Sequence, residues 1–239
     1  KGKNKKKPFG MTTKQHKEQY SKHRTKNSEA HKRKEEYFTS KIERMIGMIK
    51  TAIGKGIRFD YVLVDSWFTC FTLVQFIKSR RIGTHLIGMT KMGKTRYLFN
   101  GTKLTVKEII DHLRKARKTK RSKQLSCYYG EAIVDFNGIP IKLFFSKVTK
   151  KGKWKVLLTT DLNLKFEQTY RIYSIRWSIE VFFKESKQYL GLGQSQSQDF
   201  DAQIALTTIT MIQYNLLALA KRFTGYESLG GLFRNTTAE

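Results

Sequence analysis

The segment of residues 59–88 constrains the fold most, because two short apolar runs flank one helical pattern. Tyr61-Val62-Leu63-Val64 has a β-branched bias that is typical of a buried strand, and this strand ends at Asp65. A helix is predicted over residues 70–80 and a second strand over residues 85–88. The order strand, helix, strand predicts a partly parallel sheet and therefore an α/β fold.

The remaining chain divides into helical and β-rich stretches. An amphipathic helix is predicted to start near Tyr37 and to end at Gly54 and Gly56. A short helix is expected at 105–116, strands at about 127–135, 139–147 and 153–160, and hairpin turns at Asn137-Gly138 and Lys151-Gly152. Helices return at about 165–190 and 201–223. We interpret residues 96–164 as a β-rich insertion.

The charge of the chain indicates a polyanionic partner. There are 47 Lys and Arg against 19 Asp and Glu, so the formal net charge is +28, while 39% hydrophobic residues suffice for a sizeable core. The positive charge is concentrated in a solvated basic arm at residues 1–36 and in a predicted basic loop at 114–123. That loop contains Arg114, Lys115, Arg117, Lys118, Lys120 and Arg121. Two cysteines, Cys70 and Cys127, fit a reducing compartment rather than a disulfide scaffold.

Residues 202–220 approach the length of a membrane span. Gln203, Gln213, Asn215 and several threonines interrupt the apolar run. We therefore predict a largely buried helix of a soluble protein and no membrane partner.

The helical stretch 170–192 places four functional side chains together. On an ideal helix, Tyr173, Arg176, Glu180 and Lys187 fall within about 60° of arc, beside an apolar stripe that includes Ile175 and Ile179. An ordinary solvated face with an i,i+4 ion pair between Arg176 and Glu180 would have the same pattern. Asp65 alone is likewise ambiguous, because an Asp just past a strand is often a turn former.

These residues resemble a known family. Tyr173-x2-Arg176-x3-Glu180-x6-Lys187 is similar to the Y-x2-R-x3-E-x6-K signature of bacterial insertion-sequence transposases of the insertion-sequence-four type, and VLVDSWF at 62–68 also looks like that family. The resemblance implies a ribonuclease H-like catalytic core with a DDE carboxylate triad and a β-rich insertion. It also implies Mg²⁺-dependent, or Mn²⁺-dependent, cleavage and strand transfer of transposon-end DNA at a two-metal site.

The resemblance assigns a role to each residue. Asp65 would be the second carboxylate and Glu180 the third, both as catalytic metal ligands, with Arg176 and Lys187 on DNA phosphates and Tyr173 adding a hydroxyl contact. The acidic residues before Asp65 do not end an apolar strand, so the first Asp is expected to be missing. The chain is then the C-terminal portion of a transposase, with its ribonuclease H-like core incomplete at the N-terminus.

The expected division is a basic arm at 1–36, the first part of the core at 37–95, the insertion at 96–164 and the C-terminal core helices at 165–239. Expected partners are double-stranded DNA, as transposon ends and target, and a second copy in a synaptic homodimer. The expected location is the bacterial cytoplasm.

Three alternatives stay open. A DNA-binding transposase remnant would keep the basic surface without a complete site. A P-loop NTPase is a weaker alternative: Gly88-x4-Gly93-Lys94-Thr95 matches its pattern, but a helix should follow and RYLFNG follows instead. Trp154, between Lys153 and Lys155, could be a half-buried strand aromatic or a platform that stacks an unpaired base.

Overall fold

The protein was analysed as a computed structural model that describes residues 12, 14, 18, 21–36, 39–79, 83–223, 225 and 228–236. Much of the predicted basic arm, together with Tyr37 and Phe38 of the predicted amphipathic helix, lies outside these residues. The chain forms two compact units. One unit is Ser40–Arg176, called here the sheet unit, and the other combines Lys1–Thr39 with Trp177–Glu239 and is called the helical unit.

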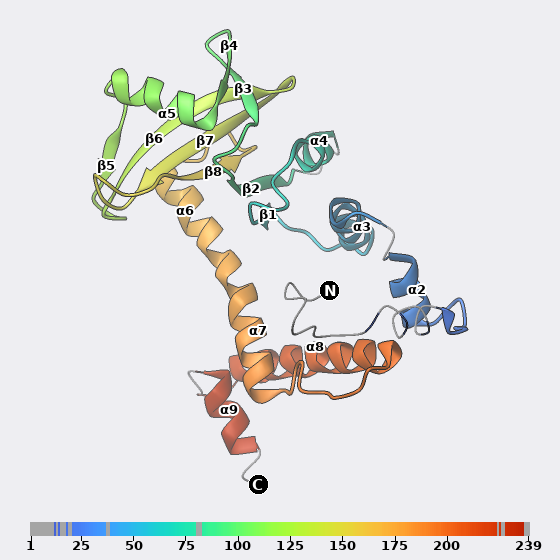
Figure 1. The fold of residues 1–239 in the computed structure, drawn as a ribbon. Coiled ribbons are helices and arrows are strands. Elements are labelled where there is room, and N and C mark those ends of the chain that lie inside the picture. Colours follow the sequence, from blue (N-terminus) through green and yellow to red (C-terminus); the bar gives the residue numbers. More distant parts are fainter. Residues whose placement is uncertain are drawn as a thin grey trace. The chain divides into compact units, whose positions relative to one another are not determined.

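The sheet unit contains one eight-stranded sheet with helices on both faces (Figure 1). Its strands are β1 (Tyr61–Val64), β2 (His85–Thr90), β3 (Arg96–Phe99), β4 (Thr102–Thr105), β5 (Lys120–Ser122), β6 (Cys127–Phe136), β7 (Ile139–Lys147) and β8 (Lys155–Thr159). Its helices are α3 (Lys41–Gly54), α4 (Phe71–Ser79), α5 (Val106–Lys115) and α6 (Phe166–Ser174), followed by the 3₁₀ turn η1 (Ile175–Trp177), which crosses into the helical unit.

The sheet order is β1-β2-β8-β7-β6-β3-β4, and β5 pairs with β6. β1 and β2 are parallel, in the register Tyr61↔His85 to Val64↔Gly88, which confirms the predicted strand–helix–strand unit. All other pairings are antiparallel. Because β8 pairs with β2, the strands of the predicted insertion continue the sheet that β1 and β2 begin. The proposed division into core and insertion remains a prediction.

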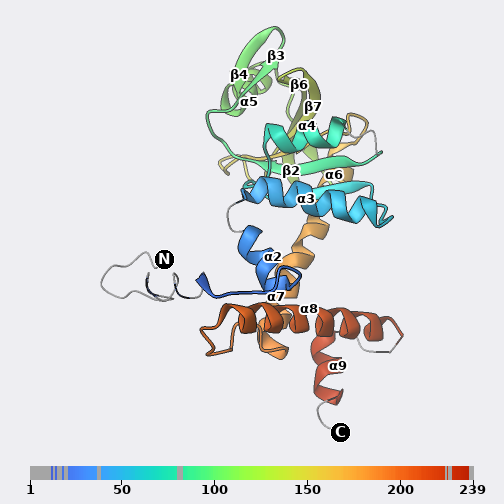
Figure 2. The ribbon, with the colours of Figure 1, turned by 90° about the vertical axis from the view of Figure 1, so that its right-hand side faces the viewer.

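Strand alternation creates two buried layers. Leu86, Leu143 and Leu158 point to the face that α3, α4 and α5 cover, and the neighbouring residues Ile87 and Phe144 point to the opposite face. On that opposite face Phe166 of α6 is fully buried and stacks on Tyr129 with ring centroids 4.4 Å apart. Figure 2 shows α3 and α4 side by side next to β2. A sheet buried on both faces explains why its central strands read as continuous apolar runs.

Helix caps and turns match the local sequence. Ser40 and Glu43 form a reciprocal capping box at the start of α3, and Thr105 and Glu108 form another at the start of α5. Asn137 and Gly138 both have positive φ, 52° and 90°, in the β6–β7 hairpin. These angles are those of a type I′ turn, which Asn-Gly favours.

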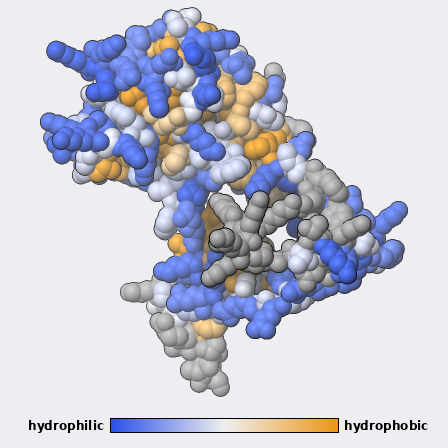
Figure 3. All heavy atoms as spheres, in the orientation of Figure 1, coloured by the Kyte–Doolittle hydropathy of each residue, from blue (hydrophilic) through white to orange (hydrophobic). Residues whose placement is uncertain are grey.

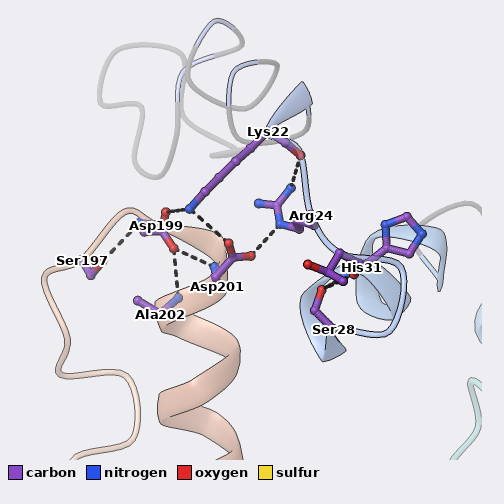
Figure 4. A network of polar contacts seen from close by, with 9 residues as sticks. Lys22, Arg24, Ser28, His31, Ser197, Asp199, Asp201 and Ala202 are labelled. Carbon is purple, nitrogen blue, oxygen red and sulfur yellow. Dashed lines mark hydrogen bonds and ion pairs between the residues drawn. The ribbon is translucent and has the colours of Figure 1, made fainter.

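The helical unit contains α2 (Glu29–Glu36), α7 (Ser178–Tyr189), α8 (Phe200–Arg222) and α9 (Leu229–Thr236). A polar cluster joins the segment before α2 to the start of α8 (Figure 4). Lys22 Nζ lies 2.9 Å from Asp199 Oδ2, and the Arg24 Nε lies 2.6 Å from Asp201 Oδ1. Asp199 also accepts hydrogen bonds from the backbone N–H groups of Asp201 and Ala202, so it caps α8.

The prediction that residues 202–220 form a largely buried helix was wrong. In α8 only Thr210 is buried, whereas Ile209, Ile212 and Leu216 are more than half exposed. Apolar residues lie all around this helix, and α7 and α9 contact it over a limited part of its surface. By length and composition, α8 is one helix in the described residues that could cross a membrane.

Candidate active site

Asp65 follows the last residue of β1 and begins a tight turn. Its Oδ1 accepts a 2.8 Å hydrogen bond from the Trp67 backbone N–H, and its backbone oxygen accepts a 2.9 Å bond from the Thr69 hydroxyl. Asp65 is therefore a turn former, as one interpretation of the sequence expected. Its second carboxylate oxygen takes part in no hydrogen bond with the protein in the described residues, which leaves it open to a ligand.

The turn fits closely over β2. A Cβ on Gly88 would overlap the Thr69 Oγ1 atom and would stand 2.8 Å from Val64 Cγ2. Gly88 is also the first glycine of the phosphate-loop pattern, and this contact is its structural role. The pattern continues into strand β3, without the helix that a phosphate loop requires, so the P-loop alternative was wrong.

Tyr173 lies near Asp65 in the sheet unit, and Arg176 lies beside Tyr173. Burial raises the pKa of the Tyr173 phenol, and the Asp65 carboxylate raises it further, whereas Arg176 and a hydrogen bond with the Met89 backbone lower it. The net direction keeps the phenol protonated at neutral pH. The Arg176 guanidinium carbon lies 5.8 Å from the Tyr173 ring centroid. A carboxylate and a neutral phenol thus lie near one another at the carboxyl end of β1, where open α/β sheets place ligands, and a guanidinium lies next to the phenol.

The predicted continuous helix at 165–190 is interrupted. α6 ends at Ser174, the 3₁₀ turn η1 follows, and α7 begins at Ser178. A 3₁₀ turn advances by about 120° per residue instead of 100°, so one angular construction does not hold across it. Ile175 and Ile179 of the predicted apolar stripe are 63% and 48% exposed, so the stripe is not a buried face here.

Glu180 and Lys187 lie on α7 in the helical unit, beyond this break. Glu180 is half-buried and Lys187 is exposed. The structure thus brings together Asp65, Tyr173 and Arg176 within one unit and divides the predicted signature between two units. The roles of all five residues remain predictions.

The carboxylate oxygens of Asp65 and Glu180 are the type of ligand that a hard divalent cation prefers. Mg²⁺ and Mn²⁺ prefer oxygen ligands, and Asp65 has a carboxylate oxygen that the protein does not engage in the described residues. In that part of the chain, however, no three His, Cys, Asp or Glu side chains are grouped so that they could hold a metal ion. Asp65 and Glu180 therefore have the ligand type that the expected metal prefers. They are two carboxylates, whereas the expected triad has three.

A second feature is a row of alternating cations and aromatic rings across four strand ends, called here the cation–aromatic row. Arg121 on β5 pairs with Tyr128 on β6, which pairs with Lys147 on β7. Trp154 is next, just before β8, with the Lys147 ammonium 4.8 Å from its ring centroid. Residues paired across antiparallel strands share a face, so the four side chains form one strip.

The cation–aromatic row lies where the predicted basic loop meets the sheet. Arg114 and Lys115 belong to the last turn of α5, and Lys120 and Arg121 belong to β5, so the loop prediction holds only for residues between them, including Arg117 and Lys118. Strand β5 forms despite its basic composition because it pairs with β6, where Ser122 lies opposite Cys127. Hydrophilic side chains gather over α5 and β5 in Figure 3.

Trp154 is half-buried and packs against the core beneath α5. This packing agrees with Trp154 as a half-buried strand aromatic. The Lys147 ammonium over its ring agrees with Trp154 as a platform that stacks an unpaired base. Trp67, Tyr128 and Lys147 were not predicted as site residues from the sequence. Trp67 could have been noticed as an aromatic residue in a turn, and Tyr128 and Lys147 only from the strand register.

Comparison with known proteins identifies a family for this chain and a similar solved structure. Residues 11–216 match a family described as the transposase DDE domain. A solved structure of the piggyBac transposase synaptic complex with hairpin DNA is similar over 83% of this chain and 39% of that chain, with 14% sequence identity and a TM-score of 0.41. This chain therefore spans about two fifths of that transposase. The search of curated proteins gave no match.

Proposed function

Because the chain belongs to the transposase DDE domain family, we propose that it carries the catalytic region of an enzyme that cleaves transposon-end DNA and joins it to target DNA. The observation that carries this proposal is the position of Asp65. Its carboxylate directly follows the parallel strand β1, with the neutral Tyr173 phenol near it and the Arg176 guanidinium next to that phenol. We further propose that the sheet unit belongs to a ribonuclease H-like core and that the signature is of the bacterial insertion-sequence-four type.

We propose that Asp65 and Glu180 are the second and third carboxylates of the triad and that both bind metal. The first Asp of the triad is not assigned to a residue. Bound Mg²⁺ or Mn²⁺ would activate a water or 3′-hydroxyl nucleophile and stabilise the leaving oxygen. Asp65 is held ready for this role because the Trp67 N–H fixes one of its oxygens and leaves the other available.

Arg176, Lys187 and Tyr173 are proposed to position the DNA. A guanidinium binds two phosphate oxygens through its fork, and an ammonium acts as a point charge. The Tyr173 hydroxyl stays protonated, so it can donate to a phosphate oxygen. These contacts would hold the scissile phosphate beside the two carboxylates.

The cation–aromatic row and the basic residues near it are proposed as a second DNA contact. Arg114, Lys115, Arg117, Lys118, Lys120 and Arg121 would neutralise backbone phosphates, which is the main source of affinity for DNA. Trp154 is proposed to stack an unpaired base, with Lys147 at a neighbouring phosphate. We also propose that the protein acts as a homodimer in the synaptic complex and is located in the bacterial cytoplasm.

Metal binding tests the proposal independently of turnover. The full chain is titrated with Mn²⁺ and the free ion is followed by electron paramagnetic resonance, in wild type, Asp65→Asn and Glu180→Gln. Each variant keeps the side-chain volume and removes a negative charge, so each should weaken Mn²⁺ binding. Asp111→Asn is the matched control, because Asp111 is an exposed carboxylate on α5 with 61% side-chain exposure. Equal Mn²⁺ binding by all four proteins would contradict the assignment of both ligands.

A specific observation favours a second candidate function, the DNA-binding remnant. The described residues lack a group of three metal-binding side chains. Mg²⁺-dependent nicking of supercoiled DNA distinguishes the two candidates. Nicking that is lost in Asp65→Asn supports the enzyme, whereas tight DNA binding without nicking in wild type supports the remnant.

A further inference from the structure

Trp67 is a large aromatic side chain that is exposed and flanked by two lysines. Its relative exposure is 70%. The Lys91 ammonium lies 4.6 Å from the indole ring centroid, and the Lys41 ammonium lies 5.5 Å from it. Lys41 begins α3, Lys91 follows β2, and Trp67 lies in the turn after β1, so three separate elements converge on one ring.

The backbone that carries the ring is held in place. The Trp67 N–H donates to Asp65, the Thr69 hydroxyl donates to the Asp65 backbone oxygen, and Thr69 packs against Gly88 of β2. Both lysines lie within the usual range for a cation–π contact. In the described part of the chain, neither has a carboxylate within ion-pair distance. The site therefore suits a ligand that provides a flat ring to displace an ammonium group from the indole and negative charge to bind the displaced lysine.

We propose that Trp67, Lys41 and Lys91 form a binding site for an unpaired nucleobase of DNA and the phosphates beside it. The indole stacks on the base, and the two ammonium groups bind the flanking phosphates, as in sequence-tolerant single-strand binding. The inference rests on the proposed function, because it places this base next to the phosphate at Asp65. This site is separate from the one proposed around Trp154.

The unpaired state of the base follows from the chemistry of stacking. Inside a duplex both faces of each base are covered by neighbouring bases, so away from an outermost base pair an indole can stack only on a frayed or extruded base. Trp67 is two residues from Asp65, so its base must belong to a nucleotide close to the scissile phosphate. The site would hold the DNA end open where the strand is cut.

Single-tryptophan proteins test this contact directly. The full chain with Trp154→Phe and Trp177→Phe retains only Trp67, and the matched control with Trp67→Phe and Trp154→Phe retains only Trp177, which is 62% exposed. Each is titrated with a single-stranded oligothymidylate and with a blunt duplex, while binding is measured separately by anisotropy of labelled DNA. We expect the oligothymidylate to quench the fluorescence of Trp67 strongly and that of Trp177 weakly.

Affinity measurements on the otherwise wild-type chain give a second test. Trp67→Ala should weaken oligothymidylate binding by about 5- to 100-fold, Trp67→Phe should restore most of it, and blunt-duplex affinity should change little. Lys41→Gln and Lys91→Gln should each lower the slope of log affinity against log salt by about 0.7. Lys50→Gln is the control, because Lys50 is an exposed lysine on the opposite side of α3 whose ammonium lies over the Phe76 ring.

The outcomes separate this inference from the proposed function. Normal oligothymidylate binding with unchanged Trp67 fluorescence, and with no effect of Trp67→Ala, would overturn the stacking site and leave the proposed function standing. Failure to bind either DNA at low salt would overturn both. Equal losses for oligothymidylate and duplex in Trp67→Ala would also overturn the inference, because they would indicate a contact that ignores base pairing.

Discussion

Gly88 of β2 lies directly beneath Thr69, with no space between them for a Cβ atom. The hydroxyl of Thr69 in turn binds the backbone oxygen of Asp65. The turn that carries Asp65 and Trp67 therefore packs on β2 at Gly88, which has no side chain. A contact of this kind makes the candidate site sensitive to a change that adds a single methyl group.

Gly88→Ala should destabilise the sheet unit by about 1–3 kcal/mol, because the added methyl must displace Thr69 or Val64 in a closely packed region. Urea unfolding followed by circular dichroism measures the free energy of unfolding. Gly93→Ala is the matched control, since a Cβ there meets no atom within 4 Å, and its effect should stay within about 0.5 kcal/mol. Equal stability of the two variants would contradict the close packing of the turn.

The polar cluster of the helical unit should respond to acid. Hydrogen bonds from Lys22 and Arg24 lower the pKa of the Asp199 and Asp201 carboxyls, respectively, below the ordinary value of 3.8. A lowered pKa in the folded state contributes stability above the unfolded pKa, and this contribution is lost as the pH falls through the folded pKa. Hydrogen-exchange protection of α2, corrected for the intrinsic rate, should therefore decrease below about pH 4.

Two variants separate charge from helix capping in this cluster. Asp199→Asn keeps a side-chain oxygen that can cap α8 and loses the ion pair with Lys22, so α2 protection at neutral pH should fall while α8 protection persists. Asp199→Ala should reduce both. Unchanged α2 protection in Asp199→Asn would show that the ion pair does not hold this segment.

The salt dependence of DNA binding should identify the basic residues in contact with phosphates. Arg121→Gln should lower the slope of log affinity for duplex DNA against log salt by about 0.9, the contribution of one phosphate contact. Arg96→Gln is the matched control, because Arg96 is also an exposed strand arginine of the same sheet and donates to the Lys103 backbone oxygen. Equal slopes for both variants would remove the cation–aromatic row from the DNA interface.

Trp154→Ala should have two measurable effects. The half-buried indole packs against the core, so its removal should lower the free energy of unfolding by about 1–3 kcal/mol. If Trp154 also stacks a base, binding of a DNA end with an unpaired base should weaken by about 1–3 kcal/mol more than binding of a blunt duplex. A loss of stability alone would leave Trp154 as a core residue.

Much of the sheet unit could be predicted from local pattern. The run Tyr61–Val64 and the hairpin around Asn137-Gly138 follow from apolar runs and from a turn that demands positive φ. Strand β5 could not be predicted, because Lys120 and Arg121 favour no strand by themselves and are ordered by pairing with β6. The 3₁₀ turn at Ile175–Trp177 contains neither glycine nor proline, so no local signal indicates it.

The candidate site was predicted in part for similar reasons. The sequence indicated Asp65 through its strand and Tyr173 and Arg176 through their shared helix face, and the structure shows that Tyr173 lies near Asp65. The grouping of Trp67 with Lys41 and Lys91 depends on three elements that meet only in the folded chain, so neither periodicity nor composition could indicate it. Strand register likewise joins Arg121, Tyr128 and Lys147, which lie on three different strands.

The ion pair between Lys22 and Asp199 has a consequence for the order of events during synthesis. The two residues are separated by 177 positions, so Lys22 leaves the ribosome long before Asp199 is synthesised. The whole of Ser40–Arg176 can fold in that interval, since it is continuous in the chain. The helical unit must instead wait for both of its segments, and its positive N-terminal segment meets its carboxylates last. A truncated translation product would therefore contain a folded sheet unit and an unneutralised basic segment.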